Sequence, residues 1–269
     1  MSILAWNSLA SFLFFVLLCG VKGKLKGVFR LPVRTILTMA AVGSCSILFY
    51  TFFLQAGMQV LPGQQAFVIQ YLWPAMVILW SVPINKESLT AGKIAAILFS
   101  FMGVVVTSVN GDLSALLGGN LYGVVMCLIS AAWYGLYSAL IKRVSFDKEQ
   151  GLLVGFGFAA LVSFSIMIPT EGFLLPTAFT MTGYVMYGLI INAIPFLLWG
   201  LALSGGNTAI IANLAYLTPI VSLFMTHLLL KEEVTLWSLL GLGLILAGIL
   251  MQMLVSEFSH NAEEKRESA

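Results

Sequence analysis

Tyr71-Leu72-Trp73-Pro74 and Tyr216-Leu217-Thr218-Pro219 are two versions of one motif, separated by 145 positions. The same offset relates three further pairs of matches: Lys86-Glu87 with Lys231-Glu232, Thr90 with Thr235, and Gly103 with Gly248. One offset that holds from the first tyrosine to the last glycine of each block indicates duplication of an ancestral segment. The chain is therefore expected to consist of two copies of one structural unit.

Composition places the chain in a membrane. Hydrophobic residues make up 60% of the sequence and charged residues 9%, whereas soluble domains carry about 25% charged residues. No charged residue occurs between Arg34 and Lys86 or from Gly172 to Leu230. Each stretch is more than twice the ~20 residues that a helix needs to cross a bilayer. The apolar runs are continuous, as in helices, and do not alternate as in barrel strands.

Charges, prolines and glycines divide the chain into nine candidate spans: 2–20, 35–56, 64–84, 92–109, 119–141, 151–169, 181–203, 208–230 and 236–255. The offset pairs the first four of these with the last four. Span 119–141 then has no partner upstream of Met1. We therefore expect an all-α integral membrane protein, an inverted-repeat bundle of five plus five helices, of which this chain carries nine and lacks the first.

The repeat also sets the expected boundaries. Residues 1–110 form the first repeat, with helices two to five, residues 111–255 the second, and residues 256–269 a polar cytoplasmic tail. Five spans separate equivalent positions, so the second copy enters the membrane in the opposite direction, which is typical of carriers. With residue 1 outside, twelve of the 13 Lys and Arg residues lie on the cytoplasmic side. This predicts a multi-pass plasma-membrane protein with a cytoplasmic C-terminus.

The repeated block, with Tyr-Leu-x-Pro, a Lys-Glu step and a glycine in the following helix, resembles the drug/metabolite transporter superfamily in its ten-helix EamA-type branch. The resemblance covers nearly the whole chain and implies a carrier of small solutes. Residues 70–74, Gln-Tyr-Leu-Trp-Pro, are similar to the corresponding helix of bacterial aromatic amino-acid exporters. That similarity implies export of amino acids or related solutes. Members of the branch use their first helix to line the central cavity.

Polar residues inside hydrocarbon must face partners or water. Gln64 and Tyr71 follow helical spacing on one face of span 64–84, and Asn213 and Tyr216 do so on its repeat mate. We expect the two tyrosines to approach a ligand from opposite sides of the repeat axis, with the two amides binding its polar end. The alternative is that these groups only bond across helices.

Aromatic residues supply a second set of candidates. Trp133 and Tyr137 are four residues apart, Tyr50 lies in the middle of its span, and Asn192 and Trp199 share a face of span 181–203. Aromatic walls suit flat or amphipathic ligands. The alternative is that they anchor helices at the membrane interface.

Proline and glycine positions complete the expected machinery. Pro74, Pro195 and Pro219 each lie within a predicted span, where a missing N–H bends a helix. The repeat-related Pro74 and Pro219 are candidates for gating. Gly103 and Gly248 are expected to let helices pack closely. The three cysteines lie in apolar runs without metal spacing and are expected to be buried hydrophobic residues.

No charged residue lies at a predicted membrane midplane, although proton-driven carriers usually need one. Transport is then facilitated diffusion, exchange or driven by the substrate gradient, unless the missing helix supplies the group. Motifs of intramembrane enzymes are lacking, so no catalytic residue, metal or cofactor is predicted. The basic stretch 22–34 is interpreted as a membrane signal meeting lipid headgroups, with no nucleic-acid partner.

The expected function is a secondary transporter of small organic metabolites, such as amino acids, by alternating access. Association into a homodimer stays open. The alternative is a non-transporting membrane scaffold, or a degenerate carrier, because the first helix is lacking.

Overall fold

The computed structural model describes residues 1–61, 63–109, 111–112, 114, 120–173, 175–230 and 235–267, with the backbone alone at 63–65, 67, 108, 219, 222–223, 226, 230 and 256–267. Regular structure in the described ranges is entirely helical. Seven stretches there are long and apolar enough to cross a membrane: Ser2–Val21, Val33–Met58, Val68–Asn85, Leu121–Arg143, Lys148–Glu171, Ala178–Gly205 and Leu236–Val255. The chain is an all-α membrane protein, as predicted.

Within the described residues, each of the nine predicted spans falls mainly on helical backbone. The ranges Ala91–Thr107 and Thr208–Leu217 are shorter apolar helices. Two spans change from α- to π-helix along their length: α3 (Val33–Ser44), η1 (Cys45–Tyr50) and α4 (Thr51–Met58) in one, α10 (Ala178–Met186), η3 (Tyr187–Ala193) and α11 (Ile194–Gly205) in the other. The last helix, α14 (Leu236–Glu267), continues past the predicted end of its span at residue 255.

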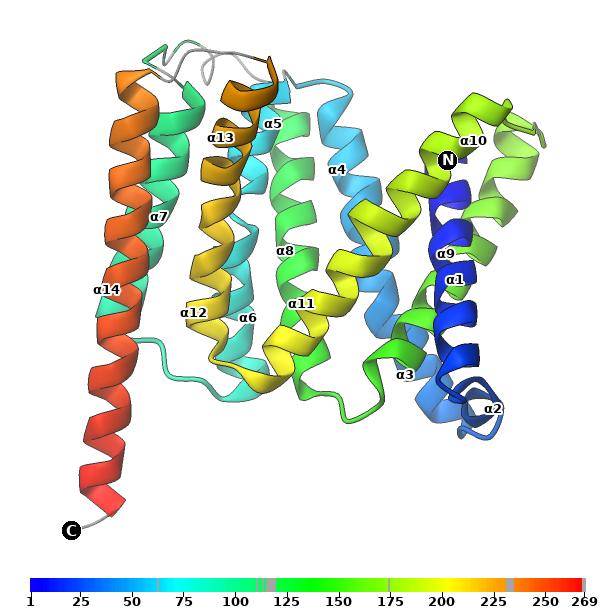
Figure 1. Cartoon of the computed structure of the whole chain (residues 1–269), viewed down its shortest axis with the longest axis horizontal. Helices are drawn as coiled ribbons and strands as arrows, with labels where there is room; N and C mark the ends of the chain where they lie inside the picture. Colours follow the sequence, from blue (N-terminus) through cyan, green and yellow to red (C-terminus); the bar gives the residue numbers. More distant parts are fainter. Residues whose placement is uncertain are drawn as a thin grey trace. The chain divides into compact units, whose positions relative to one another are not determined.

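The chain forms two compact units (Figure 1). Unit 1 contains Met1–Phe52 and Leu140–Gly205, and unit 2 contains Phe53–Ala139 and Gly206–Ala269. Each unit therefore draws helices from both predicted repeats. The repeat boundaries expected along the sequence are not the boundaries of the compact units.

In unit 1, α1 (Ser2–Val21) packs against its repeat mate α9 (Lys148–Glu171). The rings of Trp6 and Phe164 meet edge to face at 5.2 Å, and those of Phe15 and Phe156 stack at 5.8 Å. Residue numbers rise along one helix as they fall along the other, so the mates run antiparallel. An inverted repeat requires this direction.

Two π-helical segments, η1 and η3, occupy overlapping positions of the repeat, since the offset carries 45–50 onto 190–195. A π-turn interrupts the regular backbone ladder and is common at functional positions. At η3 the hydroxyl of Ser11 lies 2.8 Å from the carbonyl oxygen of Gly188 and 3.0 Å from that of Asn7. The buried serine thus satisfies a carbonyl at the irregular segment.

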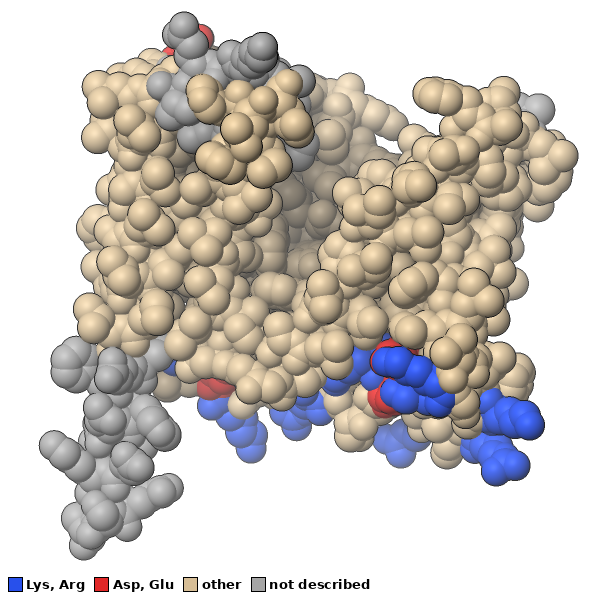
Figure 2. Space-filling view, viewed as in Figure 1, with Lys and Arg blue, Asp and Glu red and all other residues tan. Residues whose placement is uncertain are grey.

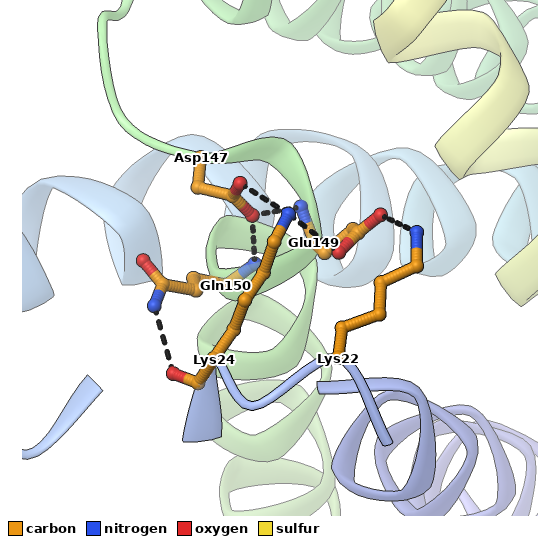
Figure 3. A network of polar contacts seen from close by, with 5 residues as sticks. All are labelled: Lys22, Lys24, Asp147, Glu149 and Gln150. Atoms are coloured by element: carbon orange, nitrogen blue, oxygen red, sulfur yellow. Dashed lines mark hydrogen bonds and ion pairs between the residues drawn. The ribbon is translucent and has the colours of Figure 1, made fainter. Parts of the chain in front are cut away.

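Lys and Arg side chains gather at the end of unit 1 where α1 ends and α9 begins (Figure 2). There, four side chains form an ion-pair clamp (Figure 3). Lys22 Nζ lies 2.5 Å from Glu149 Oε1, and Lys24 Nζ lies 2.6 Å from Asp147 Oδ2 and 2.8 Å from Glu149 Oε2. Gln150 Nε2 also donates to the Lys24 carbonyl oxygen at 3.0 Å. The clamp ties the segment after α1 to the first turn of α9.

Asp147 has a second role, because it caps α9. Its Oδ1 accepts hydrogen bonds from the backbone N–H groups of Glu149 and Gln150, which would otherwise lack partners at the helix start. Burial raises the pKa of Asp147, but the hydrogen bonds from Lys24 and the two backbone groups outweigh it, and the pKa lies below its usual value. Hydrogen bonds to Asp147 and Glu149 raise the pKa of Lys24 above its usual value.

We expect the Lys24–Asp147 pair to stabilise the fold only within a defined pH window. The share due to Asp147 is complete above about pH 4 and is lost as the pH falls through its lowered pKa. The share due to Lys24 is complete below about pH 10 and is lost as the pH rises through its raised pKa. Thermal unfolding of wild type and Asp147→Asn should therefore differ most at intermediate pH, by about 1 kcal/mol or less, since both side chains are a third exposed. Asn still caps a helix, so a difference that persists unchanged at pH 3 would contradict the ion-pair origin.

In unit 2, α7 (Ala91–Val109) packs against its repeat mate α14 over glycines. A Cβ atom on Gly103 would lie 2.6 Å from the Gly241 carbonyl oxygen, and one on Gly248 would lie 2.7 Å from the Ala96 carbonyl oxygen. Gly92 meets Val255 at the other end of the contact, so this mate pair is also antiparallel. The packing role predicted for Gly103 and Gly248 is confirmed. The three cysteines are buried and free, as expected.

Candidate functional site

Two spans of unit 2 are interrupted at equivalent positions of the repeat. Helix α5 (Gly63–Gln70) ends just before Tyr71, and α6 (Trp73–Asn85) begins two residues later. Helix α12 (Thr208–Leu214) passes through the 3-10 turn η4 (Ala215–Leu217) into α13 (Thr218–Leu230). The offset places Tyr71–Leu72 on Tyr216–Leu217, so the repeat relates the two breaks. Carriers commonly use interrupted helices to present backbone groups to a substrate.

The sequence predicts a bend at each of three prolines inside a span, whereas the structure places each proline at the start of an α-helical segment. Pro74, Pro195 and Pro219 are each the second residue of an α-helix: α6, α11 and α13. A proline in the first turn needs no N–H partner, and its fixed φ suits that position. Each proline therefore begins a new helical piece after an irregular segment. Gating by Pro74 and Pro219 stays a prediction.

The two break tyrosines contact the same buried cluster. Tyr216 is completely buried with Val104, Ile245 and Ile249, and the half-buried Tyr71 packs against this cluster. The buried Tyr216 hydroxyl has no hydrogen-bond partner among the described residues. The structure thus brings the two repeat-related tyrosines to one cluster in unit 2. That they approach a ligand from opposite sides stays a prediction.

Polar bonds join α12 to its neighbours around the second break. Asn213 is buried and donates through Nδ2 to the Gly248 carbonyl oxygen at 3.0 Å. Thr208, at the start of α12, donates to Glu87 Oε1 at 2.6 Å. The amide of Asn213 is thus partly used to bond across helices, which was the alternative to ligand binding. Its Oδ1 has no hydrogen-bond partner in the described part of the chain.

Gln70, the last residue of α5, is a site candidate that the sequence analysis did not select. Its side chain is 7% exposed, and neither Nε2 nor Oε1 has a hydrogen-bond partner among the described residues. Each unpaired polar group costs about 1–3 kcal/mol in a buried setting. Its position beside a helix break makes Gln70 a candidate contact for a ligand. The sequence signal was available, since Gln70 is a polar residue directly before the repeated motif.

Aromatic rings from α6 and α8 (Leu121–Arg143) lie close to the first break. Trp73, the first residue of α6, meets Tyr134 edge to face at 4.9 Å, and Tyr134 lies 6.0 Å from Tyr137. Of the two predicted residues on α8, Tyr137 is buried and Trp133 is half-buried. Trp73 was missed because Thr218 stands at its repeat position, and Tyr134 was missed because the choice of residues on α8 followed spacing alone.

The other predicted site residues do not join this arrangement in unit 2. Tyr50 ends η1, Asn192 lies within η3 and Trp199 lies in α11, so all three belong to unit 1, where they are half-buried. The side chains of Gln64 and Pro219 lie outside the described residues, as does the Lys231-Glu232 step. Within the described ranges, His, Cys, Asp and Glu side chains form no group of three or more that could hold a metal ion.

The model of the EamA-like transporter family matches residues 1–109 and 121–254. The chain belongs to this family. An uncharacterized transporter of Archaeoglobus fulgidus is 26% identical over 216 residues, which are 78% of this chain and 74% of that protein. The uncharacterized transporter YvbV of Bacillus subtilis is 24% identical over 202 residues, covering 72% of this chain and 64% of YvbV.

One relative of this EamA-like chain has a named substrate class. The aromatic amino acid exporter YddG of Ancylobacter novellus is 25% identical over 180 residues, which are 64% of this chain and 61% of the exporter. A solved crystal structure superposes with a TM-score of 0.79 and 20% identity, covering 95% of this chain and 87% of that one. That likeness supports the fold. Family and relatives together make the chain a membrane transporter of the drug/metabolite type with a small-molecule substrate.

Proposed function

We propose that this transporter is a secondary carrier of small amphipathic solutes, amino acids foremost, across the plasma membrane by alternating access. The observation that carries the proposal is the pair of repeat-related helix breaks in unit 2, whose tyrosines contact one buried cluster. Beside them, the Gln70 amide and the Asn213 carbonyl oxygen have no hydrogen-bond partner among the described residues. We place the polar end of the solute at Gln70 and Asn213. The predicted contacts Tyr71, Tyr216 and Gln64 belong to the same proposal.

The polar groups fit a solute that both donates and accepts hydrogen bonds. The Gln70 side chain offers an N–H₂ group and a carbonyl oxygen, and Asn213 offers a carbonyl oxygen, all without partners in the described part of the chain. A zwitterion presents an ammonium that can donate to these oxygens and a carboxylate that can accept from the amide nitrogen. Two uncharged amides can therefore bind an amino acid without a charged side chain at the break.

The apolar part of the solute is assigned to the aromatic rings. Trp73, Tyr134 and Tyr71 lie at or near the first break, and ring faces contact flat apolar groups well. The 25% sequence identity to an aromatic amino acid exporter supports the assignment of the solute's apolar part to aromatic rings. Trp133 and Tyr137, also in unit 2, remain proposed wall residues, and Tyr50, Asn192 and Trp199 in unit 1 stay predictions from the sequence.

Alternating access needs helices that can change at the site while the remaining helices keep their packing. In unit 2 the glycine contact between α7 and α14 is tight, whereas the α5–α6 and α12–α13 connections are irregular. Motion is therefore proposed at the breaks, with Pro74 and Pro219 fixing where each second helix starts. Because the sequence places no charged residue at a predicted midplane, facilitated diffusion or exchange is favoured over proton coupling.

We expect purified protein in liposomes to exchange external labelled phenylalanine for unlabelled phenylalanine inside. Tyr71→Ala and Tyr216→Ala should each reduce the initial rate about tenfold, corresponding to ~1.4 kcal/mol of lost interaction. Tyr122→Ala is the matched control, because Tyr122 is exposed at the start of α8, and it should transport as the wild type does.

The possible outcomes test the transport activity and the assignment of the binding residues separately. If wild type exchanges neither amino acids nor other small organic solutes, the carrier proposal is wrong. If wild type transports and both tyrosine variants match it, the carrier stands and the assignment of the site fails.

A further inference from the structure

The segment between α1 and α3 carries more positive charge than unit 1 can neutralise. It contains four basic residues, Lys22, Lys24, Lys26 and Arg30, and a fifth, Arg34, follows as the second residue of α3. Unit 1 contains three acidic residues, Asp147, Glu149 and Glu171. Asp147 and Glu149 are bound by Lys22 and Lys24 in the clamp (Figure 3). Glu171 is at the far end of α9. Lys26, Arg30 and Arg34 therefore have no free carboxylate within reach in this unit.

These three basic residues are exposed together with apolar side chains. The short helix α2 (Leu25–Val28) turns the chain, buries Val28, and is followed by Phe29, which is 84% exposed. Val33, at the start of α3, is 72% exposed. An exposed aromatic ring among cations is unfavourable in water, but it matches a membrane surface, where rings enter the headgroup layer and cations meet phosphates.

The ion-pair clamp holds the segment that carries these exposed residues against the start of α9. Lys22 and Lys24 bind the first turn of α9, and Gln150 Nε2 holds the Lys24 carbonyl oxygen. Because α1 and α3 on either side belong to membrane-spanning stretches, the connection between them lies at the level of the headgroups. The clamp thus uses two of the five cations internally and leaves the other three facing outward.

We propose that Lys26, Phe29, Arg30 and Arg34 form a docking surface for anionic phospholipid. The cations bind the phosphate-bearing headgroups, and Phe29 enters the headgroup layer beside them. This surface lies in unit 1 and is separate from the helix breaks in unit 2. It makes lipid binding by this transporter dependent on headgroup charge.

The test uses the full chain and counts bound lipids by native mass spectrometry, with phosphatidylglycerol or phosphatidylcholine added at low salt. Wild type should bind phosphatidylglycerol more strongly than phosphatidylcholine. Arg30→Gln/Arg34→Gln should bind phosphatidylglycerol roughly 25-fold more weakly, since each basic residue near an anionic surface contributes a factor of about five. Arg30→Lys/Arg34→Lys keeps the charge and should retain most of the affinity.

A second double variant is the matched control. Lys265→Gln/Arg266→Gln removes the same charge from the C-terminal tail and should leave phosphatidylglycerol binding unchanged. The substituted arginines are exposed, so the melting temperature of Arg30→Gln/Arg34→Gln in detergent should equal that of wild type. If this variant keeps wild-type affinity for phosphatidylglycerol, or if wild type does not distinguish the two lipids, the proposal is wrong. If inorganic phosphate or an acidic peptide at equal charge concentration displaced phosphatidylglycerol, the surface would belong to another partner and the proposal would also be wrong.

Discussion

Gly241→Val is expected to lower the yield of folded protein sharply and to reduce its melting temperature in detergent by more than any other single change considered. A Cβ atom at Gly241 would lie 2.6 Å from the Gly103 carbonyl oxygen and 2.8 Å from the Thr107 backbone nitrogen. These are backbone atoms, so a rotamer change cannot relieve the overlap, and α7 must move away from α14. Overpacking of this kind costs about 1–3 kcal/mol and more where the backbone must shift. Size-exclusion profiles and thermal unfolding measure the effect.

Gly243→Val is the matched control for this prediction. It lies two residues along the same helix, and a Cβ atom there would meet nothing within 4 Å. The same side chain is added at both positions, so helix propensity is affected alike. Equal loss of stability in both variants would show that the close contact between α7 and α14 is not what limits stability.

Gln70→Leu is expected to abolish amino-acid exchange while leaving the protein as stable as wild type or more stable. Leucine is shorter by one atom but of similar bulk, and it removes two polar atoms that have no partner among the described residues, which releases their desolvation cost of about 1–3 kcal/mol each. The same change removes the amide that we assign to the polar end of the solute. Phenylalanine exchange in liposomes and thermal unfolding of the same preparation measure the two effects.

Gln252→Leu makes the same chemical change in a second buried glutamine of unit 2. Gln252 is completely buried, and it has an interaction partner in the structure. Its replacement should lower the melting temperature. A loss of stability in Gln70→Leu as large as in Gln252→Leu would mean that Gln70 is a structural residue, and unaltered exchange would remove it from the site.

Much of the fold could be predicted because the apolar runs and the repeat that determine the helices are visible in the sequence. Continuous apolar runs bounded by charges located all nine helical ranges, and the 145-residue offset identified the mates α1 with α9 and α7 with α14, which pack antiparallel. Gly103 and Gly248 were assigned correctly, since a glycine repeated in a membrane helix has few roles other than close packing. The grouping into two compact units was not predicted, because it depends on contacts between helices far apart in the chain.

The candidate site was predicted in part. Tyr71 and Tyr216 could be paired from the repeat, and they contact one cluster in unit 2. The prolines alone could not predict that a second helix begins at each break. A proline inside an apolar run is compatible both with a bend and with the start of a new helix. Gln70 and Trp73 were missed since neither is repeated: Ala215 and Thr218 stand at the equivalent positions. Gln70 is marked by side-chain polar atoms without a hydrogen-bond partner in the described part of the chain, which only the three-dimensional structure shows.

The π-helical segments η1 and η3 have a consequence for how side chains are aimed. Each accommodates about one surplus residue relative to an α-helix. Moving that surplus along the chain by one turn advances the intervening residues by ~1.5 Å and turns them by ~100° about the helix axis. Tyr50, at the end of η1, and Asn192, within η3, are among the residues that such a step would rotate about the helix axis. Each copy of the repeat thus contains a surplus residue whose movement along the helix would reorient side chains while the helix stays intact.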